Sequence, residues 1–251
     1  MKLNTTAAII TGGASGLGEA TARYFASQGA QVTLLDRDAE RGEAVAKEIG
    51  GYFIKTDVTD ESSVQSAIDF AVEKMGRITA TVNCAGIALG IKTTGRDGPH
   101  PLDAFQRTVD INLVGSFNVA RLAAVAMARN EPEPDGARGV IINTASIAAF
   151  DGQKGQAAYA ASEGGIVGMT LPMARDLAKE GIRVMTIAPG IFKTPMLAGL
   201  PEEVQAELAK DVPNPARLGD PSEYGRLAGF IVEMGYLNGE VIRLDGALRM
   251  R

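Results

Sequence analysis

The sequence predicts an α/β fold, a single domain over residues 1–251 built on a doubly wound, seven-stranded parallel sheet. Short, continuously apolar runs alternate with longer helix-like segments, a pattern typical of parallel strands covered on both faces. A glycine-rich turn follows the first apolar run and opens the first helical segment. The length of 251 residues and the hydrophobic share of 45% suffice for one large domain, and no linker divides the chain.

Each element can be justified in chain order. The strands are expected where apolar runs have strand length, and the helices where longer segments separate them, some ending at a glycine. Pro172 lies inside the helix that begins near 157, where we expect a kink or a local break. The expected strands are 7–10, 32–35, 52–55, 80–83, 139–143, 182–187 and 241–244, and the expected helices are 16–28, 39–49, 61–75, 103–129 and one from 157. This is the Rossmann-type order.

Two loops are expected to flank a substrate cleft. Residues 87–101 leave the carboxyl end of the fourth strand, where ligands bind in such sheets. The segment 195–215 is apolar and contains proline and glycine residues that can act as hinges. An apolar lid suits an acyl chain or a steroid-like ring system. The apolar residues of the second segment are Met196, Leu197, Leu200 and Leu208.

Composition excludes several classes of function. The net charge of −5 and the lack of a Lys/Arg block argue against nucleic acid or an anionic membrane as a partner. No apolar run approaches the roughly 20 residues that span a bilayer. The single cysteine, Cys84, fits a reducing compartment, and residues 1–6 lead directly into a strand, so we expect a cytoplasmic protein without a targeting peptide. The only histidine, His100, has no partners in the sequence, and we expect no metal site.

The glycine-rich turn predicts a dinucleotide site. Glycines there let the backbone turn tightly and approach a pyrophosphate, and the free N–H groups of the helix start face the anion. The turn stands at the strand–turn–helix junction that this function requires. The residues expected at the phosphates are Gly12, Ser15, Gly16, Leu17 and Gly18.

An acidic residue at the end of the second strand favours NAD as the cofactor. Asp36 follows Gly18 by 18 residues, and its carboxylate can bind both hydroxyls of the adenosine ribose. The same charge repels a 2′-phosphate. Arg37 keeps an NADP-linked alternative open, because an arginine there can serve that phosphate.

The ends of the third and fourth strands complete the cofactor site. Asp57 can accept a hydrogen bond from the adenine amino group with Val58 against the ring, or it can cap the helix that begins near 60. Cys84 is interpreted as a small buried filler and not as a nucleophile. The fourth strand ends in small residues that let the cofactor lie close to the backbone, namely Asn83, Ala85 and Gly86.

Taken together, these motifs resemble the short-chain dehydrogenase/reductase family along essentially the whole chain. The segments 139–146, 164–172, 217–221 and 237–247 are most similar to its 3-hydroxyacyl-CoA dehydrogenase branch. The resemblance implies an NAD-dependent oxidoreductase acting on 3-hydroxyacyl-CoA, with steroid-like or other cyclic alcohols second. It also implies a homotetramer assembled through the long helix after 103, the helix from 157 and residues 243–251. The residues that carry it are the glycine turn, 83–86, Asn112, Ser146, Tyr159 and Pro189-Gly190.

The resemblance also implies roles for individual side chains. Ser146 binds the oxygen of the substrate alcohol or carbonyl, and Tyr159 takes or gives the proton. Asn112 holds a water of the proton relay. Thr194, after Pro189 and Gly190, binds the nicotinamide carboxamide.

One position departs from the family pattern. Four residues after Tyr159, where the family has a lysine, this chain has Glu163. An ordinary tyrosine has a pKa of about 10 and needs a nearby cation to ionise near neutral pH, whereas a carboxylate raises its pKa. We expect impaired turnover. Three explanations of Glu163 stay open: an altered, inactive variant of an ordinary enzyme, a natural NAD-binding or structural subunit without turnover, or another cation that compensates for the missing lysine. Lys154 and Lys193 are the candidates for that cation.

Overall fold

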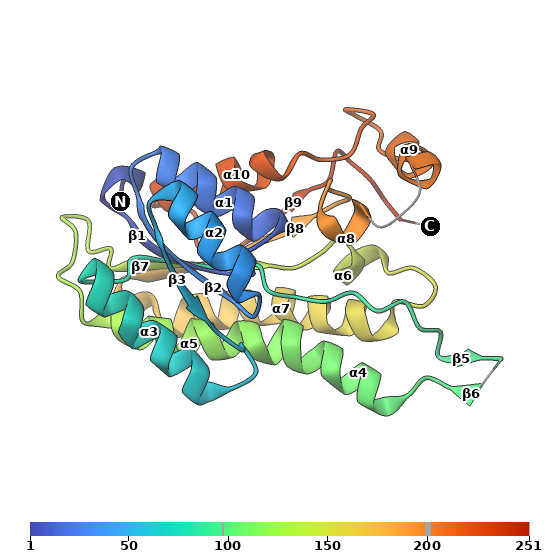
Figure 1. The fold of residues 1–251 in the computed structure, drawn as a ribbon, viewed down its shortest axis with the longest axis horizontal. Helices are drawn as coiled ribbons and strands as arrows, with labels where there is room; N and C mark the ends of the chain where they lie inside the picture. The colour runs from blue at the N-terminus through green and yellow to red at the C-terminus, as the bar shows by residue number, and fades with distance from the viewer. Residues whose placement is uncertain (97, 199–201, 251) are drawn as a thin grey trace.

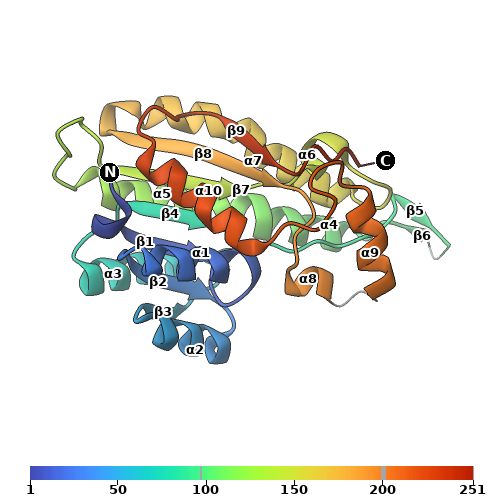
Figure 2. The same cartoon turned by 90° about the horizontal axis from the view of Figure 1, so that it is seen from above.

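A parallel sheet runs through the middle of the protein, with the strand order β3-β2-β1-β4-β7-β8-β9 (Figures 1 and 2). The computed structural model describes residues 1–96, 98–198 and 202–250. All six neighbouring strand pairs in this sheet are parallel, which confirms the predicted fold class. The strands are β1 (Ala7–Thr11), β2 (Gln31–Asp36), β3 (Tyr52–Lys55), β4 (Ala80–Asn83), β7 (Gly139–Thr144), β8 (Ile182–Pro189) and β9 (Val241–Leu244).

The strand order reverses beside β1. Ala8 pairs with Val32 of β2 on one side and with Ala80 of β4 on the other. The chain therefore runs outward from β1 through β2 and β3, then returns to build the other half from β4. Such a reversal opens a crevice at the carboxyl ends of the strands, where open α/β sheets bind ligands.

Helices cover both faces of the sheet. Figure 1 shows α1, α2 and α10 on one face and α3, α5 and α7 on the other. The long helices are α1 (Gly16–Ser27), α2 (Ala39–Ile49), α3 (Glu61–Met75), α4 (Leu102–Val109), α5 (Gly115–Ala128), α7 (Ala157–Asp176), α9 (Glu202–Lys210) and α10 (Pro221–Glu233). The short elements are η1 (Leu3–Thr5), β5 (Thr94–Gly95), β6 (Gly98–Pro99), η2 (Asp110–Val114), α6 (Ala148–Asp151), η3 (Ala178–Glu180) and α8 (Pro195–Ala198).

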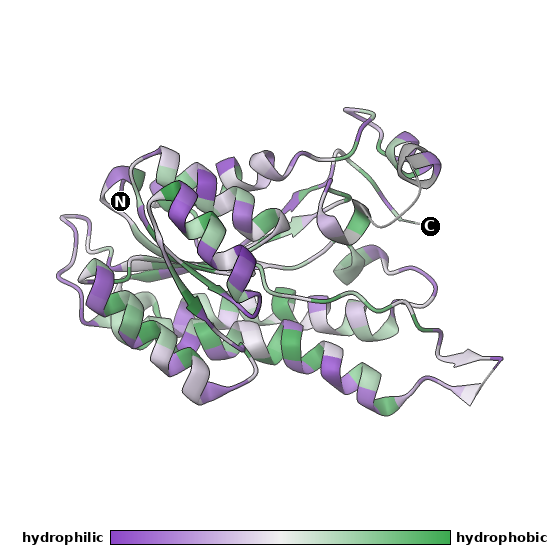
Figure 3. Ribbon diagram, in the orientation of Figure 1, coloured by the Kyte–Doolittle hydropathy of each residue, from purple (hydrophilic) through white to green (hydrophobic). Residues whose placement is uncertain are grey.

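The central strands are buried on both faces, so consecutive residues belong to different halves of the core. Ile10 packs in the cluster that contains Phe25 of α1, whereas Ile9 packs in the cluster that contains Val119 of α5. Every residue of β1 and β8 is buried. Figure 3 shows the apolar sheet between helices whose polar residues alternate with apolar ones. Two apolar layers therefore fix the sheet and, with it, the ends of its strands.

The helix predicted over 103–129 is divided in the structure. A π-helical segment, η2, separates α4 from α5. Single π-turns inside α-helices occur often at functional sites. Gly115, at the start of α5, lets the helix pack closely against Val58, because a Cβ there would lie 2.6 Å from Cγ2 of Val58. The predicted break at Pro172 does not occur, since α7 continues through it to Asp176.

The same long helix is apolar enough to be mistaken for a membrane segment. Taken together, α4, η2 and α5 make a continuous helical segment of 27 residues, whose most apolar stretch has a mean hydropathy of 1.4 and is half buried in the fold. Arg107, Asp110 and Arg121 interrupt this helix, so its longest run without a charged residue is still shorter than a membrane span. A core helix passes the same test, and this one contributes Val119, Ala120 and Ala123 to the core, all without exposed surface. Its apolar character is explained by core packing.

Candidate active site

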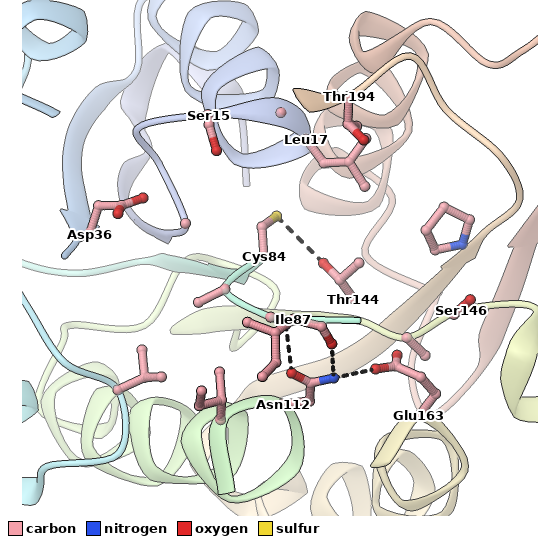
Figure 4. A pocket seen from close by; sticks show the side chains of 18 of the residues that line it. Ser15, Leu17, Asp36, Cys84, Ile87, Asn112, Thr144, Ser146, Glu163 and Thr194 are labelled. Carbon is pink, nitrogen blue, oxygen red and sulfur yellow. Dashed lines mark hydrogen bonds between the residues drawn. The ribbon is translucent and has the colours of Figure 1, made fainter. Parts of the chain in front are cut away.

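A cavity of about 390 Å³ lies at the carboxyl ends of the strands, beside the reversal of strand order. This volume falls within the usual range for ligand pockets. The cavity brings together residues from both halves of the sheet and from α1, η2 and α7 (Figure 4). The predicted residues that line it are Gly12, Ser15, Gly16, Leu17, Asp36, Asp57, Val58, Ala85, Gly86, Asn112, Ser146, Tyr159, Glu163, Pro189, Gly190 and Thr194.

The glycine turn is shaped by two close backbone approaches. Gly12 has a φ of +64°, and a Cβ there would lie 2.9 Å from the backbone of Cys84 and Ala85. A Cβ on Gly18 would lie 2.2 Å from the carbonyl oxygen of Gly12. Gly18 does not line the cavity, in contrast to its predicted place at the phosphates. It serves the site indirectly, because its lack of a side chain lets α1 start directly against the turn, so that Gly16 and Leu17 line the cavity.

Asp36 is held at the acidic end of the cavity by the turn itself. Its Oδ2 accepts a hydrogen bond from the N–H of Ala14 at 3.0 Å, and its Oδ1 accepts one from the N–H of Asp38 at 3.0 Å. The carboxylate therefore has a fixed orientation on the cavity wall. This placement suits the recognition of two vicinal hydroxyl groups.

The two interpretations of Asp57 can now be separated. Asp60, and not Asp57, caps α3, because its carboxylate accepts hydrogen bonds from the N–H groups of Ser62 and Ser63. Asp57 lines the cavity, with Oδ1 bound to the N–H and hydroxyl of Thr59 at 3.0 and 2.7 Å. These hydrogen bonds lower the pKa of Asp57. The helix-cap alternative for Asp57 is therefore excluded.

Asn83 differs from its predicted place at the cofactor. Its side chain is buried and donates to the carbonyl oxygen of Ser116 at 3.2 Å and to Oδ1 of Asn143 at 2.9 Å. It does not line the cavity and instead ties β4 to β7 and α5. The neighbouring Cys84 accepts a hydrogen bond from the Thr144 hydroxyl at 3.4 Å, and burial raises the pKa of its thiol to about 11. This agrees with its interpretation as an inert filler.

Ser146 and Tyr159 form the reacting end of the cavity. Ser146 follows β7 and accepts a hydrogen bond from the N–H of Ala148 at 3.1 Å. Tyr159 lies in the first turn of α7. Burial raises the pKa of Tyr159 well above its ordinary value, Glu163 acts in the same sense, and a hydrogen bond with the Ser146 side chain acts against both. A serine hydroxyl and a tyrosine hydroxyl on the wall of one cavity can bind one substrate oxygen and move its proton.

Glu163 lies one turn further along α7 and is almost fully buried, with 4% exposure. Its Oε1 accepts hydrogen bonds from Nδ2 of Asn112 at 3.1 Å and from the Ser162 hydroxyl at 3.3 Å. No hydrogen bond to Oε2 occurs within the described residues. This oxygen keeps some accessible surface, and Glu163 lines the cavity. Burial raises the pKa of Glu163 to about 7, although the hydrogen bonds from Asn112 and Ser162 act in the opposite sense.

Asn112 is fixed by the backbone of Ile87. Its Oδ1 accepts from the N–H of Ile87 at 2.9 Å, and its Nδ2 donates to the carbonyl oxygen of Ile87 at 2.9 Å (Figure 4). Because these two hydrogen bonds fix the orientation of the amide, it is the Nδ2 group that faces Glu163 and donates to it. Asn112 therefore makes a direct contact with the carboxylate, in addition to any role in holding a water.

Neither lysine proposed to replace the missing cation reaches the cavity wall. Lys154 and Lys193 are exposed and are not among the lining residues. Within the described part of the chain, the only Lys or Arg that lines the cavity is Arg37, whose Nε lies 3.7 Å from Oδ2 of Asp57. Arg37 belongs to the acidic end and not to the Tyr159 end. The described residues therefore provide no substitute for the family's lysine.

Among their described residues, the two segments expected to flank the substrate line the cavity only through their first residues, Ile87 and Pro195. The rest of 87–101 carries the β5–β6 hairpin, which extends beyond α4 and α7 (Figures 1 and 2). Leu200 and the side chain of Met196 lie outside the described residues. Leu197 and Leu208 are partly buried. The role of these segments stays a prediction.

Several lining residues were not anticipated from the sequence. Thr56 directly precedes Asp57, and Thr144 and Ala145 directly precede Ser146, so the strand-end rule that found their neighbours could have found them. Ile111, Ile166 and Phe192 have no such signal, because their apolar side chains also suit the core. Among residues 1–96, 98–198 and 202–250, no group of three or more His, Cys, Asp or Glu residues could hold a metal ion.

Comparison with known proteins identifies the family. Residues 6–205 match the family model described as short chain dehydrogenase. This chain belongs to the short-chain dehydrogenase family. It is 59% identical over 248 residues to 3-hydroxyacyl-CoA dehydrogenase type-2 of Homo sapiens, covering 97% of this chain and 95% of the human protein.

Two further comparisons extend over nearly the whole chain. The protein of the same name from Drosophila melanogaster is 56% identical over 252 residues, covering 99% of both chains. The crystal structure of 3-hydroxyacyl-CoA dehydrogenase type-2 from Mycobacterium avium superposes with a TM-score of 0.92 at 46% identity, covering 97% of this chain and 96% of that one. This short-chain dehydrogenase is therefore an oxidoreductase by family, and its family uses nicotinamide cofactors.

The described residues fit a nicotinamide dinucleotide. The glycine turn lies so close to the backbone of Cys84 and Ala85 that a side chain at Gly12 would not fit. The start of α1 lines the cavity, and the Asp36 carboxylate is held in place at one end of it. Ser146 and Tyr159 stand at the other end. The single misfit to the short-chain dehydrogenase pattern is Glu163.

Proposed function

We propose that this protein transfers a hydride between NAD(H) and a secondary alcohol or ketone, with 3-hydroxyacyl-CoA and 3-oxoacyl-CoA as the substrate pair. The observation that carries the proposal is one cavity that joins Asp36 to Ser146 and Tyr159. The substrate class rests on the relatives named 3-hydroxyacyl-CoA dehydrogenase type-2. Steroid-like and other cyclic alcohols are the second substrate class.

The cofactor preference is argued from charge at the acidic end. The Asp36 carboxylate, held by two backbone N–H groups, can accept from ribose hydroxyls and repels a 2′-phosphate. Arg37 is largely exposed and lies beside Asp57, so its charge is partly compensated there. Both features support NAD over NADP. When bound, this cofactor would accept or supply the hydride.

The protein side of the reaction rests on Ser146 and Tyr159. The Ser146 hydroxyl binds the substrate oxygen, and Tyr159 takes the proton from an alcohol or gives it to a developing alkoxide. A raised pKa disfavours the phenolate that alcohol oxidation needs. We therefore propose impaired turnover, with a loss within the range of about 10²–10⁴-fold that positioned acid–base catalysis contributes.

Glu163 favours a second candidate function, a protein that binds NAD without turnover or serves as a structural subunit. The cofactor residues are complete, while the described cavity wall lacks a cation near Tyr159. For either function we propose a cytoplasmic homotetramer that uses α5, α7 and residues 243–251. Apolar side chains exposed on α5 and α7 support this assembly, namely Phe117, Val125 and Leu171.

A paired measurement separates the two functions. Calorimetry with NAD and NADP would report binding, and the loss of NADH absorbance with acetoacetyl-CoA would report turnover. The first function predicts NAD binding with slow but measurable ketone reduction that a cyclic ketone supports less well. NAD binding without turnover on either ketone would favour the second function, and a lack of NAD binding would contradict both.

A further inference from the structure

The reacting end of the cavity carries an unusual charge. Glu163 and Tyr159 lie one helical turn apart on α7, and Ser146 lines the same cavity. Only Oε1 of Glu163 is occupied by Asn112 and Ser162. The carboxylate is therefore oriented by its first oxygen and presents its second to the cavity.

No positive side chain offsets this carboxylate within the described cavity wall. The other charged side chains that line the cavity, Asp36, Arg37 and Asp57, come from the ends of β2 and β3. Arg37 lies against Asp57 there. A ligand group placed beside Ser146 and Tyr159 therefore meets a negative charge that is buried in the protein, where electrostatic interactions are stronger than in water.

The two redox forms of a nicotinamide cofactor differ in charge at the group that reacts. The oxidised ring carries one positive charge, and the reduced ring is neutral. Oxidation of an alcohol would move its carbon-bound hydrogen, with two electrons, to that ring, while the hydroxyl proton would pass to the phenolate oxygen of ionised Tyr159. The attraction between a carboxylate and the ring is therefore present before hydride transfer and lost after it.

We propose that Glu163 makes this site select the redox state of the dinucleotide, binding the oxidised form in preference to the reduced form. The inference rests on the proposed function, since it needs a nicotinamide dinucleotide in the cavity. A lysine at this position acts in the opposite sense, because its charge repels the oxidised ring. Glu163 is then a specificity-determining residue whose effect is measurable without turnover.

The test is calorimetric titration of the intact protein with NAD+ and with NADH at about pH 8, where a carboxyl of pKa about 7 is mostly ionised. Glu163→Gln and Glu163→Lys are compared with Glu43→Lys, which makes the same charge change at an exposed position of α2. The ratio of the NADH Kd to the NAD+ Kd should be at least about tenfold higher in the unaltered protein than in Glu163→Lys, as expected for a charge pair of modest strength. Glu163→Gln should fall between them, and Glu43→Lys should match the unaltered protein.

The outcomes separate this inference from the proposed function. Equal ratios in the unaltered protein and in Glu163→Gln, with both nucleotides bound, would overturn redox selection and leave NAD binding intact. Tighter binding of NADH than of NAD+ by the unaltered protein would overturn it as well. If neither nucleotide binds the unaltered protein, the cofactor proposal and this inference both fail. The Glu163→Gln comparison decides the question even if Glu163→Lys does not fold.

Discussion

Nδ2 of Asn112 donates a hydrogen bond to Oε1 of Glu163 at 3.1 Å, and this bond connects η2 with α7. The Ile87 backbone fixes the amide so that it can only donate at this point. The Asn112 amide can therefore donate to Oε1 both when Glu163 is an ionised carboxylate and when it is a neutral carboxyl group with Oε1 as its carbonyl oxygen. Burial raises the pKa of this acid to about 7 and the donated hydrogen bond limits that rise, so the group titrates near neutral pH.

The first prediction concerns stability and pH. Folding raises the pKa of Glu163 from 4.5 to about 7, so the folded protein holds the proton more tightly than the unfolded chain. The protonated Glu163 therefore makes its full contribution to the free energy of unfolding below about pH 4.5. This contribution is lost as the pH rises through about 7, because the buried carboxyl must then ionise. Glu163→Gln should raise the free energy of unfolding by on the order of 3 kcal/mol at about pH 8 and by much less at about pH 5.

Urea unfolding of both proteins at the two pH values would measure this difference. The matched control is Glu43→Gln on the exposed surface of α2, which should change neither value appreciably. A gain for Glu163→Gln that is equal at both pH values would mean that the carboxyl does not titrate in this window.

The second prediction concerns turnover. Glu163→Lys replaces a charge that raises the pKa of Tyr159 with one that lowers it. We expect kcat for acetoacetyl-CoA reduction by NADH to rise at least about tenfold, within the acid–base range. The pH profile of the reverse reaction should also move to lower pH. Because Asn112 presents a donor, the lysine must extend into the cavity, so unchanged kcat and an unchanged profile would show that it cannot reach a working position.

The third prediction concerns the choice of cofactor. Asp36→Asn keeps an acceptor for the N–H groups of Ala14 or Asp38 but removes the charge. Hydrogen bonds to charged groups contribute about 1.5–3 kcal/mol, so NAD affinity should fall by about tenfold or more while NADP affinity rises. Calorimetry with both cofactors would measure the ratio, and thermal unfolding would check that the turn is intact. A parallel loss for both cofactors would argue that Asp36 acts only on the turn.

Much of the fold could be predicted because its signals are local. The ranges of α2, α3, β3, β4 and β9 agree with the predicted ones to the residue. The helix α10 was missed although Asp220, Pro221 and Glu223 form a capping box with proline in the first turn, so its signal was present. The sequence shows no local signal for the π-turn at η2, and the contacts that Asn112 makes there with Ile87 and Glu163 join distant segments of the chain.

The site shows the same division between local and tertiary information. Residues predicted at strand ends, such as Asp36 and Ser146, line one cavity because a parallel sheet brings those ends together. Gly18 and Asn83 occupy motif positions but act through packing and hydrogen bonds beneath the cavity. The sequence could not distinguish a motif residue that touches a ligand from one that supports the backbone beneath it.

The last prediction uses two helical glycines whose surroundings differ. A Cβ at Gly18 would lie 2.2 Å from the backbone oxygen of Gly12, which cannot move without opening the turn, whereas a Cβ at Gly164 would meet nothing within 4 Å. Gly164→Ala should therefore stabilise the protein by up to about 1 kcal/mol through helix propensity. Gly18→Ala should destabilise it by about 1–3 kcal/mol, as overpacking does, and should weaken NAD binding. Thermal and urea unfolding would measure both variants. If Gly18→Ala were as stable as Gly164→Ala and bound NAD normally, the close start of α1 against the turn would not be needed for the site.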